Sequence, residues 1–216
     1  ASGFKLKNSL KENIFVKLDL SETINRIRSN RSLEGLYSVD KKRYLRPSIE
    51  TSMHAILPKR YVLHVHCLNS IAYLVQKGFE EKIRNILKDL NFVIIKYIKP
   101  GIDLAKEIEK TLKNDAPEIL FLANHGLVVC NDNLNEAIQM IYFISNKLNT
   151  YTRDFVSVNS DLLQNFSSGS LYKPAYFHEV NQLAATEDSI RISSEGSLYP
   201  DHVVFLGPKT IVIESK

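Results

Sequence analysis

The sequence predicts an α/β fold, in which helices cover a central β-sheet. Short apolar runs typical of strands alternate with amphipathic runs typical of helices along most of the chain, and this alternation favours a sheet covered by helices. The 216 residues fit a single domain, and a chain of this length can bury a substantial core. The hydrophobic fraction of 44% is ordinary for a globular protein.

The strand candidates are short runs rich in β-branched and aromatic residues. In chain order they span residues 15–18, 61–66, 92–97, 119–123, 127–130, 203–206 and 211–213. We expect the last two strands to be joined by Gly207 and Pro208, which favour a turn.

The helix candidates follow recognisable start and stop residues. We expect Ser21 to cap a helix over residues 22–30, because its hydroxyl can accept a bond from a free backbone N–H group. Pro58 ends a short helix over residues 50–57. Further helices are expected over residues 80–90, from the turn at Pro100 and Gly101 to about residue 113, and from the cap Asn133 to about residue 149.

A run of small and polar residues at 165–170 indicates a loop between a long body and a C-terminal tail. We nevertheless expect one domain over residues 1–216. Because the first residue is alanine rather than methionine, we expect this domain to lack an N-terminal segment.

Composition argues against several classes of protein. The net charge is +4, but the basic residues are scattered, and the cluster Lys41-Lys42-Arg43 is too short for a nucleic-acid-binding stripe. No apolar run approaches the roughly 18–20 residues that span a bilayer. Cys67 and Cys130 make no disulfide framework. We therefore expect a cytoplasmic protein that binds neither nucleic acid nor membrane.

Two histidines in the run 61–66 suggest a metal site. Residues two apart on a strand point to the same face, so Val62, His64 and His66 share one face. Two imidazoles on one face can reach the same cation, and catalytic zinc sites use three protein ligands plus an open position. Histidines at a strand end that are merely hydrogen-bonded or exposed to solvent fit the pattern equally well.

A third ligand has to come from elsewhere in the chain, and His125 is the best candidate. It follows the strand candidate 119–123 and lies between Asn124 and Gly126, where backbone can approach a ligand closely. The same context also fits an ordinary turn residue. For His54 and His178 we favour a structural role.

Glu50 is the candidate acid–base residue. It opens the helix expected over residues 50–57. A carboxylate in the first turn is favoured by the helix dipole in any case. A purely structural role is therefore the simpler explanation until other observations are added.

Taken together, these residues resemble the class II aldolase/adducin family. The order of the motifs and the long gap before the Asn-His-Gly triplet also fit. The tail 198–208 resembles in particular the aldolase part of bifunctional rhamnulose phosphate aldolase/dehydrogenase proteins. The resemblance covers the whole chain, and its motifs are Arg46-Pro47-Ser48-Ile49-Glu50, His54, His64-Val65-His66 and Asn124-His125-Gly126-Leu127-Val128.

The resemblance implies a fold and a chemistry. The fold would be a central, mostly antiparallel sheet between helices, usually assembled as a tetramer. His64, His66 and His125 would bind one Zn²⁺, with another divalent metal as the alternative. Glu50 would transfer the proton and contact the metal when substrate is absent. A zinc ion chelated by a carbonyl and a neighbouring hydroxyl would stabilise the enediolate left by aldol cleavage.

Some parts of the family pattern differ in this sequence. Ile49 replaces a serine that helps hold phosphate in fuculose phosphate aldolase, while Ser48 is kept. Ser2 and Gly3 match a small pair of the phosphate loop, but the Gly-Asn loop expected before them lies beyond the first residue. No segment aligns with the one that carries the family's tyrosine proton donor.

The candidate substrate-binding residues come from both ends of the chain and from its middle. Asp201 and His202 precede the strand expected at 203–206 and could meet substrate or orient a metal ligand. A turn that leads into that strand explains them equally, since Pro200 fixes the backbone. The full set is Ser2, Gly3, Ser48, Asn124, Asp201 and His202.

Three functions are compatible with this sequence. The first is a metal-dependent lyase, an aldolase that acts on a sugar phosphate or a related hydroxy-ketone. The second is an epimerase, a decarboxylase or a dehydratase with the same metal site, since a fold does not fix its chemistry. The third is a non-enzymatic, adducin-like interaction module. The presence of all three histidines and of Glu50 argues against the third.

Overall fold

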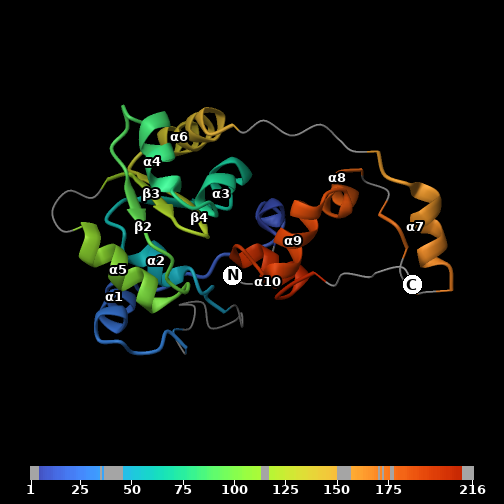
Figure 1. The fold of residues 1–216 in the computed structure, drawn as a ribbon. Coiled ribbons are helices and arrows are strands. Elements are labelled where there is room, and N and C mark those ends of the chain that lie inside the picture. The colour runs from blue at the N-terminus through green and yellow to red at the C-terminus, as the bar shows by residue number, and fades with distance from the viewer. Residues whose placement is uncertain are drawn as a thin grey trace. The chain divides into compact units, whose positions relative to one another are not determined.

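A computed structural model of the protein describes residues 5–34, 36, 46–112, 117–149, 157–169, 171, 173–175 and 178–210. The chain forms two compact units, residues 1–148 and 149–216. The strands of the described residues all belong to the first unit (Figure 1). The expectation that residues 1–216 act as one domain stays a prediction.

The first unit is built on a four-stranded sheet with the strand order β1-β4-β3-β2. β4 pairs antiparallel with both β1 and β3, whereas β2 runs parallel to β3. The sheet is therefore mixed, which corrects the expectation of a mostly antiparallel sheet. The parallel pair arises because a helix connects its two strands and returns the chain to the same end of the sheet. The strands are β1 (Tyr61–Val65), β2 (Val93–Ile95), β3 (Ile119–Leu122) and β4 (Gly126–Asn131).

Helices cover both faces of this sheet. In Figure 1, α3, α4 and α6 lie on one side of the strands, and α2 and α5 lie on the other. Two separate clusters of buried apolar side chains fill these two layers. The elements are a 3-10 turn η1 (Leu6–Asn8) and the helices α1 (Leu20–Arg28), α2 (Thr51–Ile56), α3 (Leu68–Leu74), α4 (Phe79–Ile86), α5 (Ile102–Leu112) and α6 (Leu134–Lys147).

Strand β3 contributes to both layers of the core. All of its side chains are buried. Ile119 and Phe121 pack into the cluster that includes residues of α3, α4 and α6, whereas Leu120 and Leu122 pack into the cluster of α2 and α5. This alternation follows from the two-residue period of a strand, and it explains why residues 119–123 read as a continuous apolar run.

Strand β1 shows the same alternation, as its sequence predicts. Leu63 and Val65 pack against the cluster of α3, α4 and α6, and Val62 packs against the cluster of α2 and α5. His64 therefore faces the layer of α2 and α5. The other three strands also lie within two residues of their expected ranges, which confirms those predictions.

One expected helix cap is wrong and another is confirmed. Asp19, rather than Ser21, is the N-cap of α1, and its Oδ1 accepts a hydrogen bond from the backbone nitrogen of Glu22 at 2.8 Å. The helix begins at Leu20, so Ser21 lies inside the first turn, where it cannot cap. Asn133 caps α6 as expected, by accepting two backbone hydrogen bonds with its side chain.

Three further expectations from the sequence need correction. Residues 15–18 have no regular secondary structure. Residues 203–206 belong to the helix α10 (Pro200–Leu206), which Pro200 can begin because its fixed φ suits the first helical position. The loop expected at 165–170 is helical up to residue 167, because Asn159 caps the helix α7 (Ser160–Ser167). The strand expected at 211–213 lies outside the described residues.

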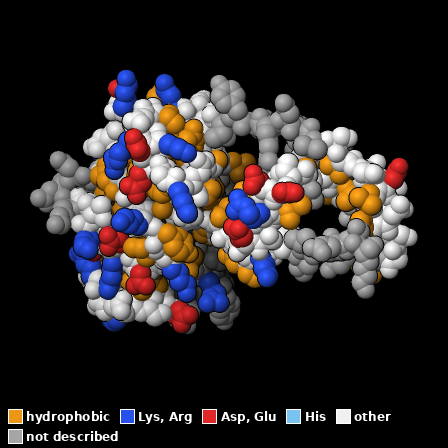
Figure 2. All heavy atoms as spheres, in the orientation of Figure 1, with side chains coloured by type: hydrophobic (Ala, Val, Ile, Leu, Met, Phe, Trp, Pro, Cys, Tyr) orange, Lys and Arg blue, Asp and Glu red, His pale blue; other side chains and the backbone are white. Residues whose placement is uncertain are grey.

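The described part of the second unit is helical. Besides α7 and α10 it contains α8 (His178–Asn181), a 3-10 turn η2 (Gln182–Ala184) and α9 (Glu187–Glu195). Its buried residues among those described are Ser189 and Ser193. In neither unit does a described helix have the length and apolar character needed to cross a membrane. Figure 2 shows basic and acidic side chains interspersed over the visible face of the first unit.

The core assignment can be tested at Phe121. This side chain is fully buried, and its ring meets that of Phe92 edge-on with 5.2 Å between the ring centroids. Phe121→Ala should lower the free energy of unfolding by about 3–5 kcal/mol, because it leaves a cavity. Phe15 is 61% exposed, so Phe15→Ala should cost less than about 1 kcal/mol. Urea denaturation followed by circular dichroism measures both, and equal losses would contradict the assignment.

Candidate metal centre

The end of β1 brings two histidines beside the turn between β3 and β4. His64 belongs to β1, and His66 follows directly after the strand. β1 pairs with β4 in the register that sets His64 opposite Val128 and Val65 opposite Leu127. This antiparallel pairing joins the end of β1 to the beginning of β4, and the turn that precedes β4 lies there.

That turn carries His125. Asn124 has a left-handed backbone conformation with φ of 51°, which asparagine adopts more readily than most residues. The turn is tied to its surroundings by hydrogen bonds from the backbone nitrogen of Ala123 to the oxygen of Ile95 (2.9 Å) and from that of Asn124 to the oxygen of Leu74 (3.2 Å). His125 is thereby held in the interior with 1% of its surface exposed.

Gly126 allows the three histidines to meet. A Cβ atom at this position would lie 2.8 Å from the carbonyl oxygen of Val65 and 3.1 Å from ring atoms of both His64 and His66. The first distance is too short for any side chain, so the close approach of β1 to β4 requires glycine here. The glycine next to His125 is therefore part of the site's architecture.

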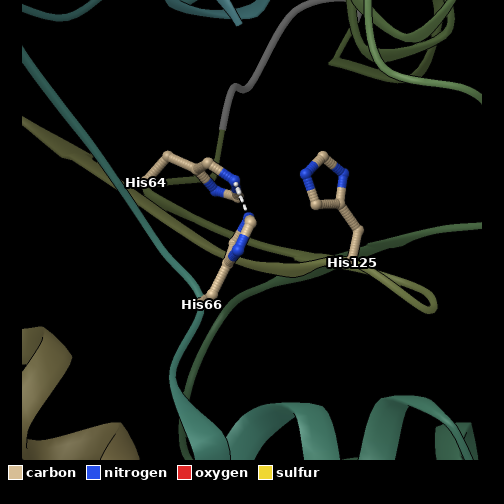
Figure 3. A group of neighbouring side chains, drawn as sticks. All are labelled: His64, His66 and His125. Atoms are coloured by element: carbon tan, nitrogen blue, oxygen red, sulfur yellow. Dashed lines mark hydrogen bonds between the residues drawn. The ribbon is translucent and has the colours of Figure 1, made fainter. Parts of the chain in front are cut away.

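The three imidazoles point toward one another, as Figure 3 shows. One nitrogen from each of His64, His66 and His125 can be chosen so that all three atoms lie within 4.8 Å of one another. The Nε2 atoms of His64 and His66 are 3.1 Å apart. Nitrogens that bind one Zn²⁺ at about 2.0–2.1 Å in tetrahedral geometry are roughly 3.3 Å apart. The three histidines are thus positioned to hold a metal ion.

Glu50 reaches this group from the start of α2, where it occupies the N-cap position. Its Oε1 lies 3.3 Å from His125 Nε2, and its Oε2 lies 3.5 Å from His64 Nε2. Burial alone would raise the pKa of this carboxyl. The contact with His125 and the nearby imidazoles of His64 and His66 outweigh burial, so the pKa is lowered and Glu50 is a carboxylate at neutral pH.

His64 is held in the form that binds metals. Burial lowers its pKa to about 4, although the Glu50 carboxylate favours the protonated form. Its Nδ1 lies 3.1 Å from the backbone oxygen of Leu127. In the neutral tautomer, Nδ1–H donates to this oxygen and Nε2 keeps its lone pair for a metal.

Unsatisfied polar atoms also fit a bound cation. Among the described residues, the buried Oε2 of Glu50 and both ring nitrogens of His125 have no hydrogen-bond partner. Leaving such an atom buried and unpaired costs roughly 1–3 kcal/mol. A cation between the carboxylate and the imidazoles would offset this cost, so the donor set fits a divalent metal ion.

The expected site residues divide between the two units. Ser48 lies two residues before Glu50, and Asn124 directly precedes His125. Ser2 and Gly3 lie outside the described residues. Asp201 and His202 lie on α10 of the second unit. The roles of all of these residues in substrate binding stay predictions.

The histidine group leaves out His54, which is exposed on α2, and His178, which belongs to α8. The backbone oxygen of Leu127 was not foreseen from the sequence. A carbonyl group carries no residue signature, so only its neighbour Gly126 in the Asn-His-Gly triplet marks the place.

The fold and the histidine group define a class of protein: an α/β domain with a metal site where an edge strand meets a buried turn. The family described as Class II Aldolase and Adducin N-terminal domain matches residues 4–152, which include nearly all of the first unit. The chain belongs to this family.

Individual relatives resemble parts of the chain. A Bacillus subtilis protein named uncharacterized oxidoreductase YuxG is 30% identical over 120 residues, which are 55% of this chain and 17% of that protein. The N-terminal class II aldolase domain of a conserved protein from Thermoplasma acidophilum is 25% identical, with a TM-score of 0.44 over 67% of this chain and 62% of that one. A sugar-phosphate aldolase from Thermotoga maritima is 16% identical, with a TM-score of 0.43 over 60% of this chain and 57% of that one. The chain thus spans less than two thirds of each relative's length.

The metal site can be tested with a matched pair of histidine variants. The wild-type protein should bind one divalent cation per chain, and His64→Ala should lose most of it, because one of three ligands is removed. His54→Ala removes a histidine outside the group and should retain the cation. Elemental analysis after incubation with Zn²⁺ and gel filtration gives the metal content. Equal content in all three proteins would show that the histidines do not form the site.

A second test concerns the close approach at Gly126. Gly126→Ala places a methyl group against the Val65 oxygen and the two histidine rings, so β1 has to move away from β4. We expect the variant to unfold at lower temperature and to bind Zn²⁺ at least about tenfold more weakly, since loss of ligand geometry costs affinity. Thermal denaturation and competition with a zinc chelator measure the two effects. Unchanged affinity would mean that the backbone accommodates the methyl group without moving the ligands.

Proposed function

We propose that this chain is a zinc-dependent, class II aldolase-type lyase that cleaves or forms a C–C bond in a sugar phosphate or a related hydroxy-ketone. The observation that carries the proposal is the Glu50 carboxylate, 3.3 Å from His125 Nε2 and 3.5 Å from His64 Nε2. Proton transfer beside a carbonyl needs a base next to an electrophilic centre, and this arrangement supplies both. Membership of the class II aldolase family supports the same reaction class.

Zinc is our choice of metal because of the donor set. Three imidazoles leave a fourth position open, which is typical of catalytic zinc sites, although imidazole also suits other divalent ions. When bound, the ion supplies a Lewis acid for a carbonyl oxygen and a neighbouring hydroxyl of the substrate. The imidazole ligands are neutral and bring no charge that would weaken this polarisation.

Glu50 is the residue that moves the proton. Its lowered pKa keeps it deprotonated at neutral pH, so it can accept a proton in one half of the reaction and return it in the other. Its side chain is 22% exposed, whereas that of His125 is 2% exposed, so the carboxylate is open to an entering substrate on one side. No Schiff-base lysine is needed for this chemistry.

The same base could serve an epimerase, a decarboxylase or a dehydratase. A screen of the zinc-loaded protein against phosphorylated ketoses and hydroxy-acids separates these reactions by their products. Released aldehyde supports the aldolase. Released CO₂ without aldehyde identifies a decarboxylase, and an isomeric sugar identifies an epimerase. Binding of zinc without any turnover would favour an adducin-like interaction module.

The proposal extends to the setting of the enzyme. We propose a small-molecule substrate whose polar groups contact Ser48 and Asn124, with Ser2, Gly3, Asp201 and His202 as further contacts. We also propose that the protein works in the cytoplasm as a homotetramer, since closed symmetric assemblies are common among soluble enzymes.

The role of Glu50 can be tested by Glu50→Gln, which keeps the shape of the side chain but removes the base. The rate should fall by about 10²–10⁴, the usual contribution of general-base catalysis. Zinc content should stay unchanged, because the three histidines remain. Glu81→Gln on α4 is a control at an exposed carboxylate away from the site.

The proton-transfer step can be observed directly by exchange of deuterium from solvent into a bound hydroxy-ketone. Exchange should be lost in Glu50→Gln and kept in Glu81→Gln. If Glu50→Gln exchanges at the wild-type rate, another residue is the base.

A further inference from the structure

The outward side of α6 carries little charge. Six exposed residues form it: Asn135, Ile138, Gln139, Tyr142, Phe143 and Asn146. Tyr142 is 67% exposed and Phe143 is 44% exposed, so two aromatic rings face outward near the middle of the helix. We call these six residues the α6 outer face. Ala137 and Ile144, on the opposite side of α6, are fully buried against the sheet.

Helix α4, on the same side of the sheet, shows the contrast. Its exposed residues include Glu80, Glu81, Lys82 and Arg84. Charged side chains keep their hydration and are depleted in the centre of protein interfaces, where aromatic residues are enriched. The surface of α4 is therefore suited to water, and the α6 outer face is suited to contact with protein.

Two charged residues of opposite sign border the α6 outer face. Glu136 lies in the first turn of α6, and Lys147 lies in the last. They are eleven positions apart, which is about three turns, so both side chains emerge along the same edge of the helix. Among the described residues neither forms an ion pair. Glu136 accepts a hydrogen bond from Asn133 at 3.1 Å, and the Lys147 ammonium lies over the Phe143 ring, 5.6 Å from its centroid.

We propose that the α6 outer face binds a second copy of this chain, with the two α6 helices antiparallel about a two-fold axis near Tyr142. A two-fold axis reverses the helix, so Glu136 of one copy comes level with the partner's Lys147 along the same edge. The symmetry then forms two such pairs at once. Tyr142, Phe143 and Ile138 are buried between the helices.

The arrangement of charge favours a second copy over another kind of partner. An acidic or a basic partner would require one sign of charge along the edge, whereas the edge carries one of each. Only a partner with the opposite order of charges matches both ends, and an antiparallel copy of α6 has that order by symmetry.

This surface is independent of the proposed function. α6 packs on the layer of α3 and α4, whereas His64 faces the layer of α2 and α5 on the other side of the sheet. Variants on the α6 outer face should therefore leave zinc content unchanged, and a failure of the aldolase proposal would not affect the interface.

The interface can be tested by reversing its charges in the full chain. Sedimentation equilibrium of the wild type should show reversible self-association. Glu136→Lys and Lys147→Glu should each weaken this step by about tenfold or more, because each places like charges together twice. The double variant restores both pairs and should recover the wild-type dissociation constant to within about threefold. Circular dichroism and zinc content verify that each variant is folded.

A cross-linking experiment covers the case in which charge reversal weakens α6 itself. Tyr142→Cys places a thiol next to the proposed axis and should give disulfide-linked dimers on mild oxidation. Asn85→Cys, exposed on α4, should give no more dimer than the wild type, which controls for Cys67 and Cys130. A wild type that stays monomeric, a double variant that does not recover, or equal cross-linking of the two cysteine variants would overturn the proposal.

Discussion

Strand β1 is joined to the sheet through β4, and the pairs from Tyr61 opposite Asn131 to Val65 opposite Leu127 set its register. A slip by one residue would turn His64 to the layer of α3 and α6 and would expose the metal side to apolar residues. The beginning of the strand is anchored at the other end of this pairing, where the backbone nitrogen of Arg60 donates to Asp132 at 3.0 Å. The register thus closes the core and assembles the metal centre at the same time.

Burial and charge act against each other in this centre. Taking Glu50 out of water raises its pKa, and the surrounding imidazoles lower it further than burial raises it. For His64 the balance goes the other way, because burial outweighs the attraction of the carboxylate and lowers the pKa to about 4. Both results favour a carboxylate beside a neutral imidazole, which is the protonation state that a divalent cation requires.

The two faces of the sheet serve different purposes. One face holds the metal centre, where α2 delivers Glu50 to the histidines. The other face is covered by α3, α4 and α6, and its outer surface is free to take part in contacts that do not touch the chemistry. Because β3 sends alternate side chains into both layers, the two faces share a rigid centre while their surfaces can change separately.

Local patterns in the sequence determined a large part of this protein. The two-residue period placed His64 on the α2 side of β1, and the apolar run 119–123 marked the buried strand β3. The Asn-His-Gly triplet identified the turn at His125, and the start of a helix identified Glu50. These features could be predicted because each depends on residues that are neighbours along the chain.

Contacts between distant residues decided the rest. The parallel pairing of β2, the steric need for glycine at position 126 and the hydrogen bond of His64 to the Leu127 oxygen all depend on which segments meet in space. The run 203–206 gives the clearest example, because its β-branched residues predict a strand but lie in the helix α10. A strand needs a neighbouring strand for its hydrogen bonds, whereas a helix satisfies its own, so tertiary structure decides between them.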